Sequence, residues 1–208
     1  MDEDWLELAS GLEGSRYLVN TYYSGSTRNY THLYDTEMLT SLWTAYPLSS
    51  SFMGSLDRPS GWSCNPSIDE KYQVKVTSYS YSNSTYSKGH MCPKNSRDAD
   101  QTMLEQTFYV TNQVPQIQNS FNGGIWNDLE GAVQGVAESN SSETIYVVTG
   151  VAFWFEHKAY SDNSYTDYTV SVDQVEEWTG FDFFVNLPDS VEAAAEAQNT
   201  SWSEFSAF

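Results

Sequence analysis

The sequence FNGGIWNDLEGAVQGVAE, at residues 121–138, has the clearest secondary-structure pattern in the chain. Its apolar residues recur at spacings of three and four positions, which predicts one amphipathic helix with a single buried stripe. That stripe consists of Ile125, Leu129, Ala132, Val133 and Val136. Gly131 and Gly135 weaken the helix, each by about 1 kcal/mol at an exposed interior position.

Strand-like segments lie on both sides of this helix. Composition predicts strands at 16–23, 30–35, 38–47, 108–110, 144–148 and 181–187. A helical turn near 98–106 and helices at 173–178 and 190–198 are expected as well. Because strands and helices mix without regular βαβ alternation, and no repeat or long linker interrupts them, the prediction is one α+β domain over residues 1–208.

Composition excludes several classes of protein. The 208 residues are 39% hydrophobic and 15% aromatic, which argues against a disordered chain. No stretch approaches the roughly 18 apolar residues of a membrane helix, so no membrane partner is expected. Met1 leads directly into acidic residues, so we expect no signal peptide in this chain, although its Ser, Asn, Thr and Tyr content favours a secreted or cell-envelope protein.

The charge of the chain is strongly negative and unevenly distributed. The net charge is −19, which by default disfavours a polyanionic partner. Residues 1–97, however, net only −2, whereas residues 98–208 net −17. Six of the nine cations lie within one stretch of forty residues: Arg58, Lys71, Lys75, Lys88, Lys94 and Arg97. Either acidity serves solubility and this clustering is chance, or the cluster marks an anionic ligand.

Three histidines are candidates for acid–base chemistry. His32 lies within a predicted strand and His157 lies beside two charged residues, so both are interpreted as structural or surface residues. His90 follows a glycine in a predicted loop, among Lys88, Lys94 and Arg97. Nearby positive charge lowers the pKa of an imidazole and keeps it neutral, as a general base near pH 7 must be.

A second candidate site is at the start of the predicted helix. At about 100° per residue, Asn122 and Glu130 are roughly 80° apart around the helix axis. An amide oxygen and a carboxylate on one side can hold a hydrated Mg²⁺ ion. The alternative is that Asn122 caps the helix and Glu130 is a solvated surface residue.

These residues fall within a series of motifs that resembles a known family. The motifs are YSKGHMCP at 86–93, SR at 96–97, TFYVTN at 107–112, PQ at 115–116 and FNGGIWNDLE at 121–130. Their order and spacing are similar to those of the DNA/RNA non-specific endonucleases, the ββα-metal or His-Me finger nucleases. The resemblance covers most of the chain and implies a mainly antiparallel central sheet with flanking helices.

The resemblance also implies roles for individual residues. It gives His90 as general base, Asn122 as metal ligand and Glu130 as support for the metal's water shell. Arg58 and Lys88 are implied to stabilise charge on the phosphate. Further substrate contacts are implied for Lys88 and for three other residues: Lys94, Arg97 and Asn112. The expected reaction is Mg²⁺-dependent (or Mn²⁺-dependent) hydrolysis of DNA and RNA to products with 5′-phosphates.

Two departures from the family pattern bear on activity. Ser87-Lys88 replaces the family's Asp-Arg, which keeps the positive charge but loses the planar guanidinium fork that binds phosphate with two hydrogen bonds. After Gly150 the chain resembles a shortened version of the family sheet. Separately, Cys64 and Cys92 are open to two interpretations: a disulfide that joins two loops of the site, or two unrelated free thiols.

Two other functions remain open alongside the nuclease hypothesis. One is a catalytically impaired family member that acts as an extracellular binding module through its Tyr and Trp residues. The other is an acidic mimic of nucleic acid, as the charge of −19 suggests. The mimic does not account for the cations around His90, and the binding module does not account for the ordered motifs.

Overall fold

A four-stranded antiparallel sheet forms the centre of the computed structural model, which describes residues 5–74, 85–151, 169–205 and 207. Its strand order is β2-β3-β4-β7. The strands are β2 (Tyr17–Ser24), β3 (Thr27–Asp35), β4 (Thr40–Leu48) and β7 (Ile145–Gly150). These strands confirm the predictions at 16–23, 30–35, 38–47 and 144–148.

Both faces of this sheet are packed. Along β4, Trp43 and Ala45 belong to one apolar cluster, and Tyr46 and Leu48 belong to another. This division follows from the strand period of two, which sends successive side chains to opposite faces. The sheet therefore separates two layers of the molecule.

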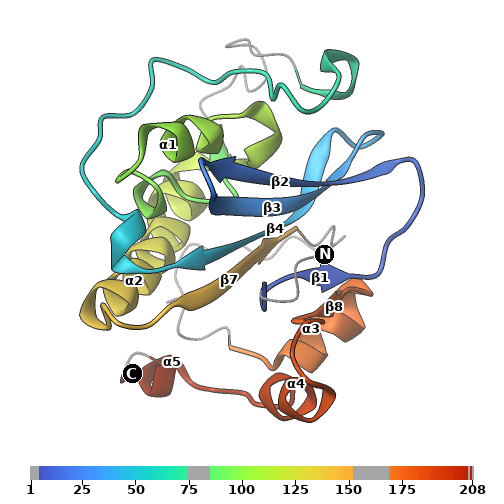
Figure 1. The fold of residues 1–208 in the computed structure, drawn as a ribbon, viewed down its shortest axis with the longest axis vertical. Coiled ribbons are helices and arrows are strands. Elements are labelled where there is room, and N and C mark those ends of the chain that lie inside the picture. The colour runs from blue at the N-terminus through green and yellow to red at the C-terminus, as the bar shows by residue number, and fades with distance from the viewer. Residues whose placement is uncertain (1–4, 75–84, 152–168, 206, 208) are drawn as a thin grey trace.

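Different elements cover the two faces (Figure 1). The face with Tyr46 packs against α2 (Trp126–Ser139) through Val133 and Ala137. The face with Trp43 packs against β1 (Ala9–Ser10), β8 (Asp182–Phe183) and α3 (Val172–Thr179). In Figure 1, α3 and α4 (Asp189–Glu196) lie beyond β7, away from α1 (Gln101–Thr107) and α2, whereas α5 (Trp202–Phe205) lies below the end of α2. The expected α+β class is confirmed.

A second antiparallel pair, β5 (Tyr86–His90) with β6 (Gln113–Ile117), leads to the central helix. The prediction placed His90 in a loop, whereas it is the last residue of β5. The helix predicted at 121–138 divides into a π-helical segment, η5 (Gln118–Ile125), and α2. The break is at Gly124, whose φ of −126° and ψ of −117° are not helical.

The remaining predictions were met in part. The helices expected near 98–106, 173–178 and 190–198 correspond to α1, α3 and α4. The strand expected at 108–110 was wrong, because Phe108 ends α1 and Val110–Asn112 form a 3₁₀ turn. The strand expected at 181–187 shortens to β8, because Phe184 adopts a φ of +57°, which is incompatible with a strand.

β7 is an edge strand of the sheet within the described residues. Within those ranges, β7 pairs with β4 alone. The predicted shortening after Gly150 concerns 152–168, and His157 is also outside the described residues. Among the residues that the structure describes, no helix has the length and apolarity needed to cross a bilayer.

Candidate active site

The order β5, β6, η5, α2 brings His90 and Asn122 onto neighbouring elements. His90 pairs with Gln113, the first residue of β6. β6 runs directly into η5, which carries Asn122 and contacts β5. Two strands followed by a helix therefore connect the predicted base to the predicted metal ligand.

The positions of Asn122 and Glu130 relative to a common helix axis differ from the predicted ones. The angle of roughly 80° assumed one continuous α-helix. The backbone at Gly124 breaks that helix, so Asn122 lies on the π-helical segment and Glu130 on α2. The amide nitrogen of Asn122 donates to Oε1 of Gln118 at 3.3 Å. Its amide oxygen, the atom predicted to bind a metal ion, takes no part in that bond.

The imidazole of His90 is held between two aromatic rings. Its centroid lies 4.7 Å from the Trp62 ring and 4.9 Å from Phe108, which meets it edge to face. Two cations flank the same rings. The Arg58 guanidinium lies 5.2 Å from the Phe108 centroid, and Nζ of Lys88 lies 6.0 Å from that of Trp62. Arg58, Lys88 and His90 thus share one aromatic platform.

Burial controls the protonation of His90. Burial and, to a smaller extent, the Arg58 charge lower the pKa of the imidazole from 6.5 to about 3. The prediction of a neutral imidazole is therefore supported, although its main cause is burial rather than positive charge. A neutral ring can accept a proton throughout the physiological pH range.

The two described histidines differ in their hydrogen bonds. His32 is buried in the sheet, with Nε2 at 3.1 Å from the Tyr22 hydroxyl and Nδ1 at 2.9 Å from Oγ of Ser41. Both of its nitrogens are satisfied, as expected of a structural residue. Nε2 of His90 is buried without a partner. An unsatisfied buried nitrogen costs stability and is found preferentially at functional positions.

Glu130 lies in an environment that disfavours its negative charge. Burial raises its pKa from 4.5 to about 7. The indole N–H of Trp126 approaches this carboxylate and partly offsets that effect, but it lies outside hydrogen-bonding geometry. The Glu130 charge in turn raises the pKa of Cys92 and Tyr46, which places it on the side of α2 that faces the sheet. It is therefore not a fully solvated surface residue.

Replacing Glu130 with glutamine is expected to stabilise the metal-free protein above pH 7 and to leave stability unchanged below about pH 4.5. The folded-state pKa of about 7 exceeds the ordinary 4.5, so the protonated carboxyl group favours the folded state. Wild-type stability is therefore lost as the pH rises through this window, by at most about 3 kcal/mol. Urea unfolding of both proteins in EDTA, at either end of the window, measures the difference. A pH-independent difference contradicts the prediction.

Gly89 is fixed by a close approach between β5 and β6. A Cβ atom at this position would lie 2.0 Å from Oε1 of Gln116 and 2.1 Å from its Cδ. Gln116 is itself buried, so its side chain has little room to move away. The glycine before His90 is therefore required by packing between the two strands.

Replacing Gly89 with alanine is expected to destabilise the protein by about 1–3 kcal/mol, the usual cost of overpacking a buried site. The added methyl group forces β5 and β6 apart and shifts His90, so kcat is expected to fall too. Thermal unfolding and initial rates measure the two effects. The double variant Gly89→Ala, Gln116→Ala should recover part of both losses, and a double variant as impaired as Gly89→Ala contradicts this explanation.

Two predicted substrate contacts are structural residues instead. Arg97 is 0% exposed, and its guanidinium donates to Oδ1 and the carbonyl of Asn29 and to the carbonyl of Pro47. Asn112 is also fully buried, with hydrogen bonds to both backbone groups of Cys92 and to the carbonyl of Thr107. Neither side chain can reach a nucleic acid, but Asn112 holds the chain two residues beyond His90.

The predicted group of cations is dispersed in the fold. Lys94 forms an ion pair with Asp98 at 3.0 Å, and Lys71 forms one with Asp69 at 3.1 Å. Lys75 lies outside the described residues. Arg58 and Lys88 are therefore the members of this group that lie beside His90.

The two cysteines are free thiols in the structure. Cys92 is buried in the apolar cluster with Tyr46 and Leu48, and burial raises its pKa to about 11. Cys64 is half-buried. Of the two interpretations, the structure supports the unpaired thiols.

The elements around His90 carry polar groups that suit a hydrated metal ion. Nε2 of His90 and Oε1 of Gln113, two residues that pair directly across β5 and β6, are both buried without partners. Such atoms are normally satisfied by ordered water. The Asn122 amide and the Glu130 carboxylate supply the hard oxygen ligands that Mg²⁺ and Mn²⁺ take. The residues present therefore fit a hydrated divalent ion.

Sequence reasoning missed the aromatic side of this site. Trp62 lies outside the strands and helices predicted from the sequence, and Phe108 was assigned to a strand. Trp62 follows the predicted phosphate-binding Arg58 by four residues, which is the one signal in the sequence that connects it to the site.

Comparisons with known proteins agree with this arrangement. The family model described as DNA/RNA non-specific endonuclease matches residues 15–154. A nuclease of Nostoc sp. is 23% identical over 207 residues, which cover 79% of this chain and 74% of the relative. Mitochondrial nuclease EXOG of Danio rerio is 32% identical over 124 residues, or 59% of this chain and 35% of the relative. The chain therefore matches about a third of that protein's length.

A solved structure shares the fold. It is the crystal structure of the EndoG/EndoGI complex, which describes the mechanism of EndoG inhibition. The likeness has a TM-score of 0.66 at 19% identity, and it covers 85% of this chain and 90% of the other. Because the family model spans well over half of the sequence, including β5, β6, η5 and α2, this chain belongs to the DNA/RNA non-specific endonuclease family.

Proposed function

We propose that this protein is an endonuclease that hydrolyses phosphodiester bonds of DNA and RNA, with His90 as the general base and a divalent metal ion on Asn122. Membership of the family supports the nuclease activity and the need for a divalent ion. The observation that carries the proposal is the neutral imidazole of His90, with an unpartnered Nε2, on a strand in contact with the element of Asn122.

In this proposal, different residues of the site contribute to different parts of the reaction. Neutral His90 takes a proton from a water molecule, which attacks phosphorus in line with the leaving 3′ oxygen and leaves a 5′-phosphate. Arg58 and Lys88, next to the same aromatic rings, stabilise the negative charge that builds up on the phosphate oxygens. Asn122 would hold a divalent ion, with Glu130 supporting its water shell, and that ion would supply further stabilisation of this charge and of the leaving oxygen.

The fold separates this basic site from much of the acidic surface. The acidic elements α3 and β8 pack on the sheet face with Trp43, whereas Cys92, two residues after His90, packs on the face with Tyr46. The sheet therefore stands between the substrate and those carboxylates. Contacts to phosphate rather than to base edges do not read sequence, which suits a non-specific nuclease.

The test of this function is digestion of plasmid DNA and of RNA by wild type and by Asn122→Ala, with Mg²⁺ and with EDTA. Asn127→Ala is the matched control, because Asn127 is an exposed asparagine only five residues later, in the first turn of α2. Wild type and Asn127→Ala should digest both substrates with Mg²⁺ and neither substrate with EDTA. Asn122→Ala should lose activity at low Mg²⁺.

The other results assign a different role. Digestion that persists in EDTA equally for all three proteins rejects this mechanism and indicates a contaminant. A well-folded wild type that binds nucleic acid without cleaving it supports the binding module. Wild type that neither binds nor cleaves nucleic acid, but binds a basic protein in its place, supports the nucleic-acid mimic.

A further inference from the structure

Five carboxylates converge between the C-terminal elements, on the far side of the sheet from His90. Three of them, Asp173 and Glu176 on α3 and Glu196 at the end of α4, form what we call the α3–α4 acidic cluster. One oxygen from each lies within 4.8 Å of the others. Asp182 on β8 and Glu192 on α4 form a second such group that shares Glu196.

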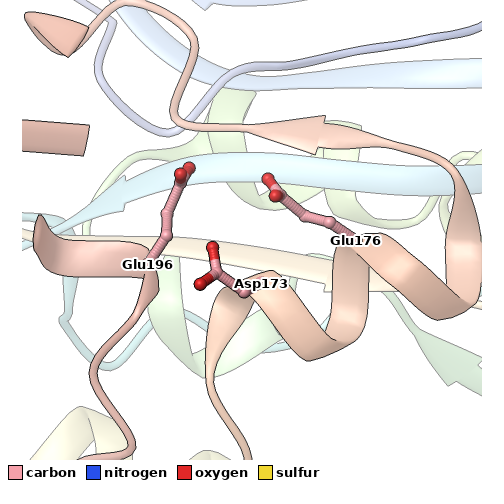
Figure 2. Close-up of side chains that lie close together, drawn as sticks. All are labelled: Asp173, Glu176 and Glu196. Atoms are coloured by element: carbon pink, nitrogen blue, oxygen red, sulfur yellow. The ribbon is translucent and has the colours of Figure 1, made fainter. Parts of the chain in front are cut away.

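Glu196 is the unusual member of the cluster. It is 7% exposed, although it lies on a short surface helix, and its Oε1 is buried without a hydrogen-bond partner. Figure 2 shows the carboxylates of Glu196, Glu176 and Asp173 gathered between α4 and α3. A carboxylate that is buried and unpaired costs several kcal/mol unless a positive charge faces it.

No side-chain cation supplies that charge among the residues that the structure describes. The charged groups that act on Glu196 are all carboxylates, and after burial they are the reason that its pKa is raised to about 7. The cations Arg16, Lys71 and Lys94 form ion pairs with carboxylates outside the cluster. A bound cation would relieve this repulsion.

From the buried, unpartnered Glu196 and the convergence of carboxylates on it, we infer that the α3–α4 acidic cluster binds one Ca²⁺ ion that ties α4 to α3. The cluster offers oxygen ligands alone, the kind that Ca²⁺ takes. Mg²⁺ usually keeps several of its waters and takes one or two carboxylates, so a group of three carboxylates suits Ca²⁺ better.

The protein already provides part of the support for such a site. Oε1 of Glu176 accepts the backbone N–H of Phe183 at 2.8 Å, which orients the carboxylate and connects the cluster to β8. Asp173 and Glu176 are three residues apart on α3, so both carboxylates lie on one face of the helix. The ion would join α3, α4 and β8 at the point where their negative charges meet.

Thermal unfolding of the 208-residue protein tests this site. After EGTA treatment, at about pH 8 and constant ionic strength, Ca²⁺ and Mg²⁺ are titrated into wild type and Glu196→Gln. Wild type should gain about 5–10 °C in Tm at a Ca²⁺ concentration about 100 times Kd, and less with Mg²⁺. Glu196→Gln should lose that gain, because glutamine keeps the shape but not the charge.

Three further variants separate the site from other effects of Ca²⁺. Glu138→Gln removes one charge from an exposed position on α2 and should keep the full gain. Asn122→Ala alters the proposed catalytic metal site and should keep it too, with one Ca²⁺ per chain by calorimetry. Asp173→Asn, which changes an exposed member of the cluster, should lose the gain in Tm. It takes the place of Glu196→Gln in the test if that variant does not fold. No gain for wild type, or an equal gain for Glu196→Gln and Asp173→Asn, overturns the proposal.

Discussion

Replacing His90 with alanine is expected to lower kcat for DNA and RNA by about 10²- to 10⁴-fold, the usual contribution of a general base. The ring is enclosed by Trp62 and Phe108 and is neutral at pH 7, so no other described side chain on this platform can take its place. The proposed contacts of Arg58 and Lys88 with phosphate are unaffected by this substitution, so KM should change much less than kcat. Initial rates over a range of substrate concentrations separate the two parameters.

Two variants distinguish a loss of catalysis from a loss of folding. His90→Asn keeps a polar side chain between the two rings and should be as inactive as His90→Ala, with a Tm close to that of wild type. His32→Ala should show the opposite pattern, because His32 bonds to Tyr22 and Ser41 inside the sheet. The Tm of His32→Ala should fall, while kcat per folded molecule should stay close to that of wild type. Activity within tenfold of wild type for His90→Ala would remove His90 from the mechanism.

Replacing Arg97 with alanine is expected to lower the free energy of unfolding by about 3–5 kcal/mol, because it removes a large buried side chain together with its hydrogen bonds. The guanidinium is buried and satisfies the side chain and carbonyl of Asn29 and the carbonyl of Pro47. It also stacks on Tyr46 and Phe52, with centroid distances of 5.0 and 4.5 Å. Its removal leaves the acceptors unpaired in a closed space.

Urea unfolding measures this loss against two comparisons. Arg97→Lys keeps the charge but loses the planar fork, so it should be intermediate in stability. Lys94→Ala, three residues earlier, removes a half-buried ion pair with Asp98 and should cost less than about 1 kcal/mol. If Arg97→Ala and Lys94→Ala are equally stable, Arg97 does not act as a structural residue.

The elements predicted well are those whose pattern is local. The strands at 16–23, 30–35 and 38–47 and the helix beginning after Ile125 are all visible in composition or periodicity, because each packs one face against a core. β5 was missed because a five-residue strand with Lys88 and Gly89 has no alternation of its own. It exists through its pairing with β6, and that contact is non-local.

The same distinction between local and non-local information applies to the site residues. His90 and Asn122 were identified from residue type and motif order, and the fold brings their elements into contact. Arg97 and Asn112 were misassigned because a polar residue type does not reveal whether it lies on the surface or in the core. The kink at Gly124 was missed as well, since glycine is compatible with both a weakened helix and a broken one.

The sequence by itself determined the fold class, the family and the candidate base, because these depend on residue types and their order along one chain. The tertiary structure alone decided which cations face His90, that burial rather than charge keeps its imidazole neutral, and that Glu196 is enclosed by like charges. These properties depend on distances between residues far apart in sequence and on the exclusion of water, and both arise when the chain packs.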